Sequence, residues 1–257
     1  MVSQNNINNT VVNNNFSVNK TTASSTCVAS VNHSDNSSTT SHAEILVQSG
    51  GTSGGDSFFR ASVSGVQSYS FGIDNSDSDN LKITTGSTPS AGTTLWNMAA
   101  SGILSSPLQP VFSAYLATAD SNITGNGTAA TLGSGTALTE IKDTGGDFNT
   151  NGTFTAPVSG RYYLCGIISI SSLSGGTDYI CDIVSSNWTY EFDDCDAVAQ
   201  IGTSSSYSTQ GTFLVDMDSG DTATIQCTLT GVGADTTDFR APVGGIITNA
   251  YSGCLAC

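Results

Sequence analysis

Residues 148–170 have the sequence FNTNGTFTAPVSGRYYLCGIISI, and this stretch decides the fold. Runs rich in β-branched and aromatic residues lie on both sides of Pro157 and Gly160. Proline fixes the backbone angle that a turn needs at its second position, and glycine accepts conformations that other residues avoid. The stretch therefore predicts two strands joined by a turn, with Tyr162 entering the core just after the turn.

Similar short runs extend from this stretch to both ends of the C-terminal half. Apolar residues in them show none of the three- and four-residue spacing of an amphipathic helix. Several strands at short spacing predict an all-β sandwich or barrel. The expected strands cover residues 112–117, 128–132, 137–142, 152–156, 162–170, 179–184, 188–192, 211–217, 222–229 and 242–248.

The N-terminal half divides into two parts. Residues 1–40 contain 10 Asn and few large apolar side chains, so they cannot form a core alone. We interpret them as a segment that attaches to a partner, and an unattached tail is the open alternative. Residues 41–105 alternate apolar and polar side chains in short runs, which predicts a small antiparallel β module; these runs are 44–48, 58–63, 69–73 and 81–84. The proline-containing stretch 101–110 marks the boundary to a head at 106–257.

The charge of the chain excludes several classes of partner. Asp and Glu number 21 against 6 Lys and Arg, which gives a net charge of −15. Nucleic acid and anionic membranes attract clustered basic residues, so neither is expected as a partner. The chain contains no apolar run of the ~18 residues that a membrane-spanning helix needs. Residues 1–9 (MVSQNNINN) lack the charged and apolar regions of a secretion signal, so we expect synthesis in a cytoplasm, where the chain stays or which it leaves by another route.

The spacing of Phe154, Pro157, Gly160 and Tyr162 resembles the F-x-x-P-x-x-G-x-Y pattern of C1q/TNF-like jelly rolls. The resemblance covers residues 110–250. Within it, 110–116 resembles the opening strand, 214–226 a Gly-Asp hairpin and 243–249 the closing strand, without the aromatic residue that the family has there. It implies an all-β jelly-roll head of a kind that is typically trimeric.

Residues 54–85 resemble a β module of bacteriophage tail fibres, in which it precedes similar C-terminal heads. The two resemblances together imply a homotrimeric tail fibre or spike, assembled in the host cytoplasm and displayed on the virion surface. Its N-terminal segment would bind other virion proteins, and its head would bind a glycan or protein of the host surface. A capsid decoration or head-fibre protein without a receptor, and a soluble carbohydrate-binding adhesin, are the alternatives. Collagen-like repeats are absent, so the β module would form the stalk.

Aromatic and acidic side chains in one segment of the head are the candidates for receptor binding. Aromatic rings stack on sugars and carboxylates bind hydroxyl groups, which favours Trp188 and Tyr190 beside Asp193, Asp194 and Asp196. The alternative for Trp188 is a place in the sandwich core or in a trimer contact.

Calcium is the one cofactor for which the sequence offers ligands. Asp74, Asp77 and Asp79 alternate with amides and hydroxyls like the start of a calcium loop, but the Gly and Glu that complete an EF-hand are missing. A solvated turn between two strands is the alternative, and we expect no resident cofactor. The Asp193–Asp196 region is a second place where neighbouring chains of a trimer could complete a calcium site.

Seven cysteines raise the question of a disulfide. Cys181 and Cys195 lie equally far from residue 188 in an expected hairpin, so a bridge between them is considered. Cys254 and Cys257 form a terminal CxxC without the βαβ context of a redox motif.

We expect no enzymatic activity. Both histidines, His33 and His42, lie in the polar N-terminal region, where they would have to reach a pocket of the head to assist a nucleophile. The chain has three glutamates, and its aspartates show no spacing that selects a catalytic pair.

Overall fold

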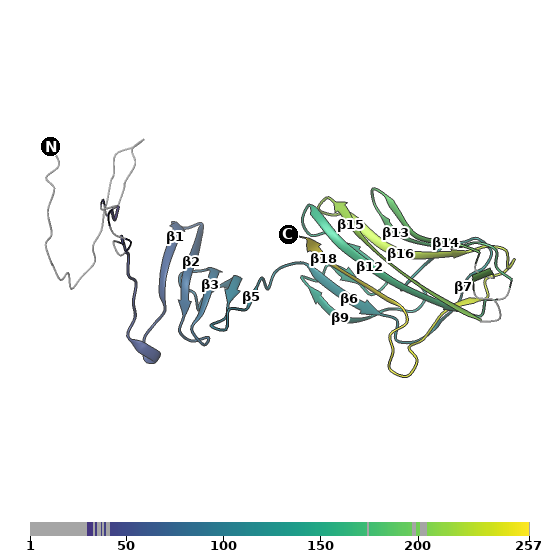
Figure 1. Ribbon diagram of the computed structural model, residues 1–257, viewed down its shortest axis with the longest axis horizontal. Helices are drawn as coiled ribbons and strands as arrows, with labels where there is room; N and C mark the ends of the chain where they lie inside the picture. Colours follow the sequence, from purple (N-terminus) through teal and green to yellow (C-terminus); the bar gives the residue numbers. More distant parts are fainter. Residues whose placement is uncertain are drawn as a thin grey trace.

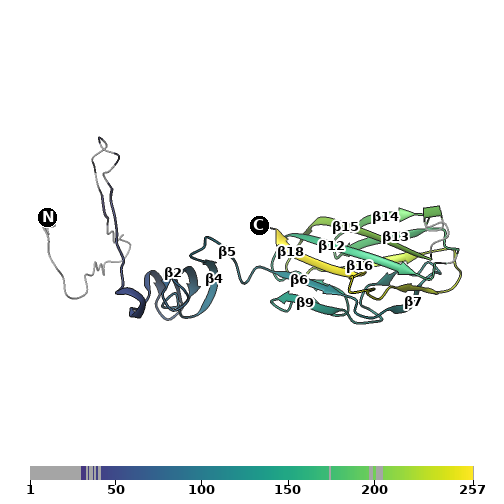
Figure 2. The same ribbon diagram turned by 60° about the horizontal axis from the view of Figure 1, so that its bottom comes forward.

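The computed structural model describes residues 30–32, 34, 37, 39, 42–173, 175–196, 199–200 and 205–256. The expected attachment segment therefore lies largely outside the described residues, as do Cys27, His33 and Cys257. Figures 1 and 2 show a small sheet and a larger two-layered head joined by a single stretch of chain. Strands account for nearly all of the regular structure of the described residues, which confirms the all-β prediction.

The small sheet is an antiparallel meander in the order β1-β2-β3-β4-β5. A short 3-10 turn, η1 (Gly51–Ser53), precedes it. Its strands are β1 (Ser57–Val63), β2 (Gln67–Asp74), β3 (Asn80–Thr85), β4 (Thr93–Met98) and β5 (Leu104–Ser105). Three of the predicted runs are strands here, whereas 44–48 forms none and β4 was not predicted.

The head consists of two packed sheets. The first has the path β9-β6-β18-β12 with β15 on the far side of β12, and the second has the order β10-β11-β16-β13-β14. The chain passes repeatedly between the sheets: β12 of the first is followed by β13 and β14 of the second, then by β15 of the first and β16 of the second, as in a jelly roll. This strand order confirms the predicted jelly-roll sandwich.

The strands of the first sheet surround the long central strand β12, which pairs with β15 along its whole length. Two short strands, β7 and β17, extend this sheet at the end of β12. The strands are β6 (Val111–Tyr115), β7 (Asp120–Thr124), β9 (Thr139–Thr144), β12 (Gly160–Ser171), β15 (Ser206–Met217), β17 (Thr237–Phe239) and β18 (Ala250–Ala256).

The second sheet centres on β16, which pairs with β11 and β13 and also with the short β8. The strands are β8 (Ala130–Thr131), β10 (Phe148–Asn149), β11 (Thr153–Thr155), β13 (Tyr179–Ser185), β14 (Thr189–Cys195) and β16 (Thr222–Leu229).

Aromatic rings from both sheets fill the space between them. The ring of Phe112 in β6 stacks on Phe148 and on Phe154, with centroids 4.7 Å apart in each pair. Tyr251 of β18 meets Phe112 edge-on at 4.8 Å, and Tyr162 of β12 meets Phe154 at 5.3 Å. All five side chains are buried. The predicted position of Tyr162 in the core is therefore confirmed, and its hydroxyl donates to the Val158 carbonyl at 2.7 Å across the predicted turn.

The closing strand lies later in the chain than we predicted. Residues 242–248 form a loop with one isolated bridge between Val243 and Ile246, and the strand is β18 instead. The aromatic residue that seemed to be missing is Tyr251, which is 1% exposed. The predicted segment is apolar, but its Ile246 is 69% exposed.

We predict that Phe112→Ala strongly destabilises the head. The change removes a ring that contacts both sheets, and deletions of this kind cost about 3–5 kcal/mol of the free energy of unfolding. Denaturant unfolding followed by circular dichroism at a fixed protein concentration measures the loss. Ile141→Ala is the control, because Ile141 in β9 is 60% exposed and should change stability by less than about 0.5 kcal/mol. Equal effects of both substitutions would contradict this account of the core.

Candidate functional site

The ends of the sandwich differ in the loops that they carry. The chain enters the head at Pro110 and leaves near Leu255, whose N–H donates to the Pro110 carbonyl at 3.0 Å. We call this end of the head the base. The strands β12, β14 and β16 end at the opposite end, and β7 lies there too (Figure 1). We call residues 121–127, 172–178 except 174, and 230–238, together with the end of β14, the distal loops.

Trp188 lies at the base, in the turn between β13 and β14. The Ser185 hydroxyl accepts the N–H groups of Asn187 and Trp188, at 3.3 and 3.0 Å, and so holds the turn. The indole is 69% exposed. Within the described chain Trp188 is therefore not a core residue, which excludes the first of the two alternatives for it.

Tyr190 belongs to the margin of the core. It lies opposite Ile183 of β13, and its ring packs on Phe213 with centroids 5.4 Å apart. A ring held in this way has little free face for a ligand, so the prediction that Tyr190 binds a receptor is not supported by its contacts.

The acidic candidates lie at the other end of β14 from Trp188. Asp193 lies five positions after Trp188 along an extended strand, a span of about 17 Å. The structure therefore does not bring the predicted aromatic and acidic groups together. Asp194 is exposed, and the Asp196 carboxylate accepts the N–H of Ala199 at 3.0 Å, as a residue that caps a short turn does.

Asp193 points partly into the head. One of its carboxylate oxygens is buried without a hydrogen-bond partner among the described residues, as is the hydroxyl of Tyr179. Burial, followed by the neighbouring Cys227, Cys181 and Asp193, holds the pKa of Tyr179 well above its usual value of 10. Tyr179 thus stays a neutral phenol. Asp193 is partly buried, whereas Asp194 and Asp196 are exposed.

Other carboxylates brace the distal loops. Asp238 accepts the N–H of Asn122 at 2.9 Å through one oxygen and the Ser172 hydroxyl at 2.8 Å through the other. Asn122 and Ser172 both have positive φ, at 59° and 64°. Asp235 accepts two hydrogen bonds from Asn126 in the same way, at 3.3 and 3.0 Å. These contacts fix loop conformations that the backbone alone disfavours.

The distal loops present acidic oxygens without cationic partners. The two ion pairs found in the described chain both belong to Lys82 of the small sheet. The described partners of Asp235 and Asp238 are instead neutral hydrogen-bond donors. Such a surface can accept hydrogen bonds from the hydroxyls of a sugar or from a basic protein surface.

The Cys181–Cys195 bridge that we considered is wrong. A bulge between Cys181 and Asp182 shifts the register of the hairpin, so Cys181 lies opposite Asp193 and Cys195 opposite Tyr179. On its other side Cys181 lies opposite Cys227 of β16. All three are free thiols, and burial is the main cause that raises the pKa of Cys181 and of Cys195.

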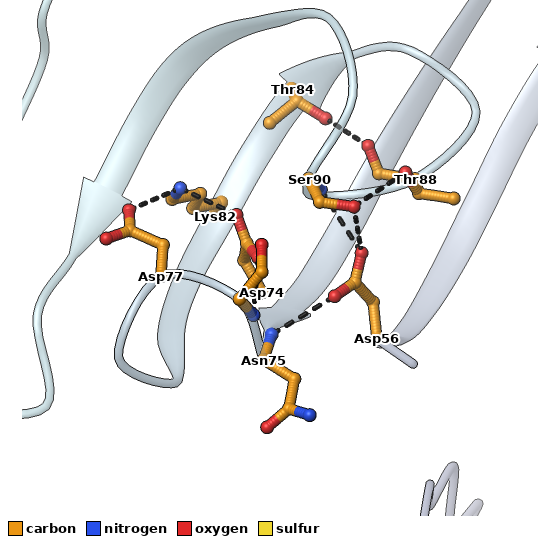
Figure 3. A network of polar contacts seen from close by, with 9 residues as sticks. Asp56, Asp74, Asn75, Asp77, Lys82, Thr84, Thr88 and Ser90 are labelled. Carbon is orange, nitrogen blue, oxygen red and sulfur yellow. Dashed lines mark hydrogen bonds and ion pairs between the residues drawn. The ribbon is translucent and has the colours of Figure 1, made fainter. Parts of the chain in front are cut away.

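A lysine lies among the candidate calcium ligands of the small sheet. Figure 3 shows Lys82 between Asp74 and Asp77, with its Nζ 2.8 Å from Asp74 Oδ2 and 2.5 Å from Asp77 Oδ2. Asp74 also accepts the Ser76 hydroxyl at 2.6 Å, whereas Asp79 is exposed with a φ of 58°. An ammonium group already neutralises the two carboxylates, so the contacts favour the alternative of a braced turn between strands. No group of three or more His, Cys, Asp or Glu suited to a metal occurs in the parts of the chain that the structure describes.

The described chain shows no assembled catalytic group. His42 is exposed in the segment before η1 and has no assigned partner in the head. One hollow in the described part of the head, about 520 Å³, is open and lined by polar groups that include Glu140 and Asp147. Burial and the nearby Asp143 raise the pKa of Asp147. Asp143 itself accepts the N–H groups of Asp147 and Phe148, both at 3.2 Å, as a turn residue does. The expectation that the chain is not an enzyme remains a prediction.

Comparisons with known proteins find similar folds at low sequence identity. The head is similar to the globular domain of the zebrafish complement 1qA protein, with 17% identity, a TM-score of 0.37 and coverage of 58% of this chain and 98% of that one. It is also similar to murine APRIL at pH 8.5, with 9% identity, a TM-score of 0.38 and coverage of 58% and 99%. No family model matches the chain. No curated protein matches it either. The C1q/TNF-like fold thus rests on the strand order described above.

Among the described residues, no helix is long and apolar enough to cross a membrane.

The ion pairs of Lys82 make the stability of the small sheet depend on pH. Burial alone would raise the pKa of Asp74, but the hydrogen bonds from Lys82 and Ser76 and the charge of Lys82 lower it below 3.8. Because the pKa is lower in the folded state, Asp74 stabilises the fold above about pH 4, and the contribution is lost as the pH falls through the folded pKa.

We predict that Asp74→Asn lowers the free energy of unfolding near pH 6 by about 1–3 kcal/mol and that the difference from wild type narrows towards pH 2. The fluorescence of Trp96, the tryptophan of the small sheet, follows its unfolding in a Trp188→Phe background. Asp79→Asn, in the same turn, should leave stability nearly unchanged at both pH values, because Asp79 is exposed and asparagine accepts its backbone conformation. A difference for Asp74→Asn that stays constant with pH would contradict the assignment.

Proposed function

We propose that the chain is a homotrimeric fibre or spike protein of a bacteriophage virion, whose distal loops contact the host-cell surface. One observation carries this proposal. The chain enters the head at the base and returns there, where the Leu255 N–H donates to the Pro110 carbonyl, so within the described residues the connection to the small sheet lies at the base and not at the distal end (Figure 2). A head attached only at its base can present the opposite end to a target.

The outward face of the first head sheet supports a trimer. Tyr163 of β12 is 50% exposed there, and its neighbour Leu214 of β15 is 44% exposed. On the other side of Tyr163 the row continues with Cys254 and Val111, both half-buried. When a second subunit covers an apolar row on an outward face, the burial of apolar surface lowers the free energy of the assembly. Heads that this one resembles are typically trimeric, and three copies around an axis would cover the row in each.

The distal loops supply the recognition chemistry. Exposed Asp194 and the braced loops around Asp235 and Asp238 offer hydrogen-bond acceptors in fixed positions. Fixed acceptors suit a glycan or a protein surface that donates hydrogen bonds, because little conformational entropy is lost on binding. In this proposal Trp188 at the base does not take part in receptor binding.

Attachment to the particle belongs to the N-terminal segment in this proposal. Its composition prevents an independent core, and contact with other virion proteins would provide one. The protein would then be assembled in the host cytoplasm and displayed on the virion surface. A decoration protein without a receptor and a soluble carbohydrate-binding adhesin share the same head and differ in what the distal loops and the N-terminal segment do.

We predict that virions carrying Asp194→Lys adsorb to their host cells about tenfold more slowly than wild type, because the charge of an exposed distal side chain is reversed. Thr189→Lys is the matched control, since Thr189 is an exposed residue at the base end of the same strand. The adsorption rate constant at fixed ionic strength is the measurement. Unchanged adsorption for Asp194→Lys and for removal of the whole head would favour a decoration protein. Binding of the isolated protein to cells without any virion role would favour an adhesin.

A further inference from the structure

We infer that the apolar face of the β1–β5 sheet is an assembly surface that is buried against the same face of other copies of this chain. The strand register places the side chains of Phe59, Phe71, Ile83 and Trp96 in one row across four strands. A second row beside it contains Ile73, Leu81, Met98 and Leu104. One face of this sheet is therefore apolar over its whole width.

This apolar face is the uncovered one. Phe59 is 51% exposed, Phe71 46% and Ile73 42%. Towards the β1–β2 turn, Val63 is 64% exposed and Tyr69 48%. Side chains that alternate with these point to the other face.

The other face is largely polar, and its part in β2 and β3 is buried. Ser70 and Thr84 are fully buried, and their hydroxyls donate to the carbonyls of Gly86 and Thr88, at 2.8 and 3.0 Å. Asp74 and Lys82, 3% and 8% exposed, form their ion pair on the same face. Figure 3 shows the loops with Asp77 and with Thr88 and Ser90 around this network. The loops of the chain thus cover the polar face and leave the apolar one bare.

A sheet arranged in this way gains little from the hydrophobic effect within one chain. Its covered face contributes hydrogen bonds and an ion pair, whose net contributions are modest because the unfolded chain bonds to water instead. The main driving force of folding, burial of apolar surface, is left for another partner to supply.

Charge and area point to copies of the same chain as the partner. Arg60 and Lys82 lie opposite Ser70 and Gly72, so both belong to the polar face, and the apolar rows contain no charged residue. Aromatic side chains offer about 150–250 Å² each, so the exposed parts of these rows amount to on the order of 600 Å² per chain. That is at the upper limit of what a monomer leaves bare and close to the ~800 Å² that each partner contributes to a stable interface.

Residues 1–29 are the other candidate to cover this face. They contain one aromatic residue, Phe16, and a few aliphatic residues among eight asparagines, one glutamine and other polar side chains. The identical face of a second copy offers aromatic and aliphatic rows of matching width. The inference goes beyond the proposed function, because it concerns a surface separate from the head and holds whether or not the head binds a receptor.

Trp96 provides a local test in the full-length protein. The chain has two tryptophans, so Trp188→Phe leaves Trp96 as the only tryptophan, whose emission is observed by excitation at the red edge of indole absorption, where tyrosine does not absorb. We expect its emission to be blue-shifted and weakly quenched by acrylamide, as for a buried indole. Adding Phe59→Asp, which places a charge in the row, should shift the emission to the red and raise the quenching constant several-fold. Ser62→Asp is the matched control, because Ser62 is an exposed residue of the same strand on the polar face, and it should leave both readings unchanged.

The outcomes separate the occupants of the face. If the far-UV circular dichroism shows that Phe59→Asp unfolds strands, Leu104→Asp in the two-residue edge strand β5 is used as the test variant instead. The same red shift and increase in quenching are expected for it. An emission that is red and strongly quenched in the parent protein, and equal in the variants, would overturn the inference. An emission that becomes red when residues 1–29 are deleted, in a protein that remains associated through its head, would assign the face to the N-terminal segment and also overturn it.

Discussion

Contact between aromatic rings of the two head sheets is the interaction on which the rest of the structure depends. Phe112 and Tyr251 come from one sheet, and Phe148 and Phe154 from the other, with ring centroids between 4.7 and 5.9 Å apart. Aromatic pairs of this kind contribute both a large buried area and a preferred geometry. They fix the distance and register between the sheets close to the base of the head, where the chain enters and leaves.

This anchoring determines what each end of the head can do. The base is occupied by the connection to the small sheet and by the turn that holds Trp188. The distal loops carry little apolar surface and are held by carboxylates that accept backbone and side-chain hydrogen bonds, such as Asp238 with Asn122. A stable sandwich with one braced and unoccupied end is an arrangement that presents loops to a target. The proposed fibre uses this arrangement, and the bare face of the small sheet adds a second surface at which chains can meet.

The fold could be predicted from residues 148–170 because proline, glycine and alternating apolar residues act locally. The closing strand could not, since β18 contains Gly253, which reads as a turn residue in the sequence. A Cβ at Gly253 would lie 2.7 Å from the Phe112 ring, so glycine is required there by close packing. The segment 242–248 is more apolar, yet it forms an exposed loop. Its hydrophobicity was thus a misleading signal.

The candidate site depended on register, which sequence spacing does not reveal. The bulge beside Cys181 moves Cys195 out of reach, and strand length separates Trp188 from Asp194. Similarly, alternation in 58–73 predicts strands but not which face the loops will cover. The sequence did not predict that Lys82 forms an ion pair with Asp74. Contacts between residues distant in the chain decide these points.

The absolute mass of the full-length protein, measured by light scattering with and without EDTA, tests the central claim most directly. The account predicts a mass near three times the 26.2 kDa of one chain in both buffers, because it proposes that neighbouring chains cover the apolar faces of the head and of the small sheet. A fall in mass on adding EDTA would show that a metal ion bridges the chains. A mass of one chain in both buffers would contradict the account.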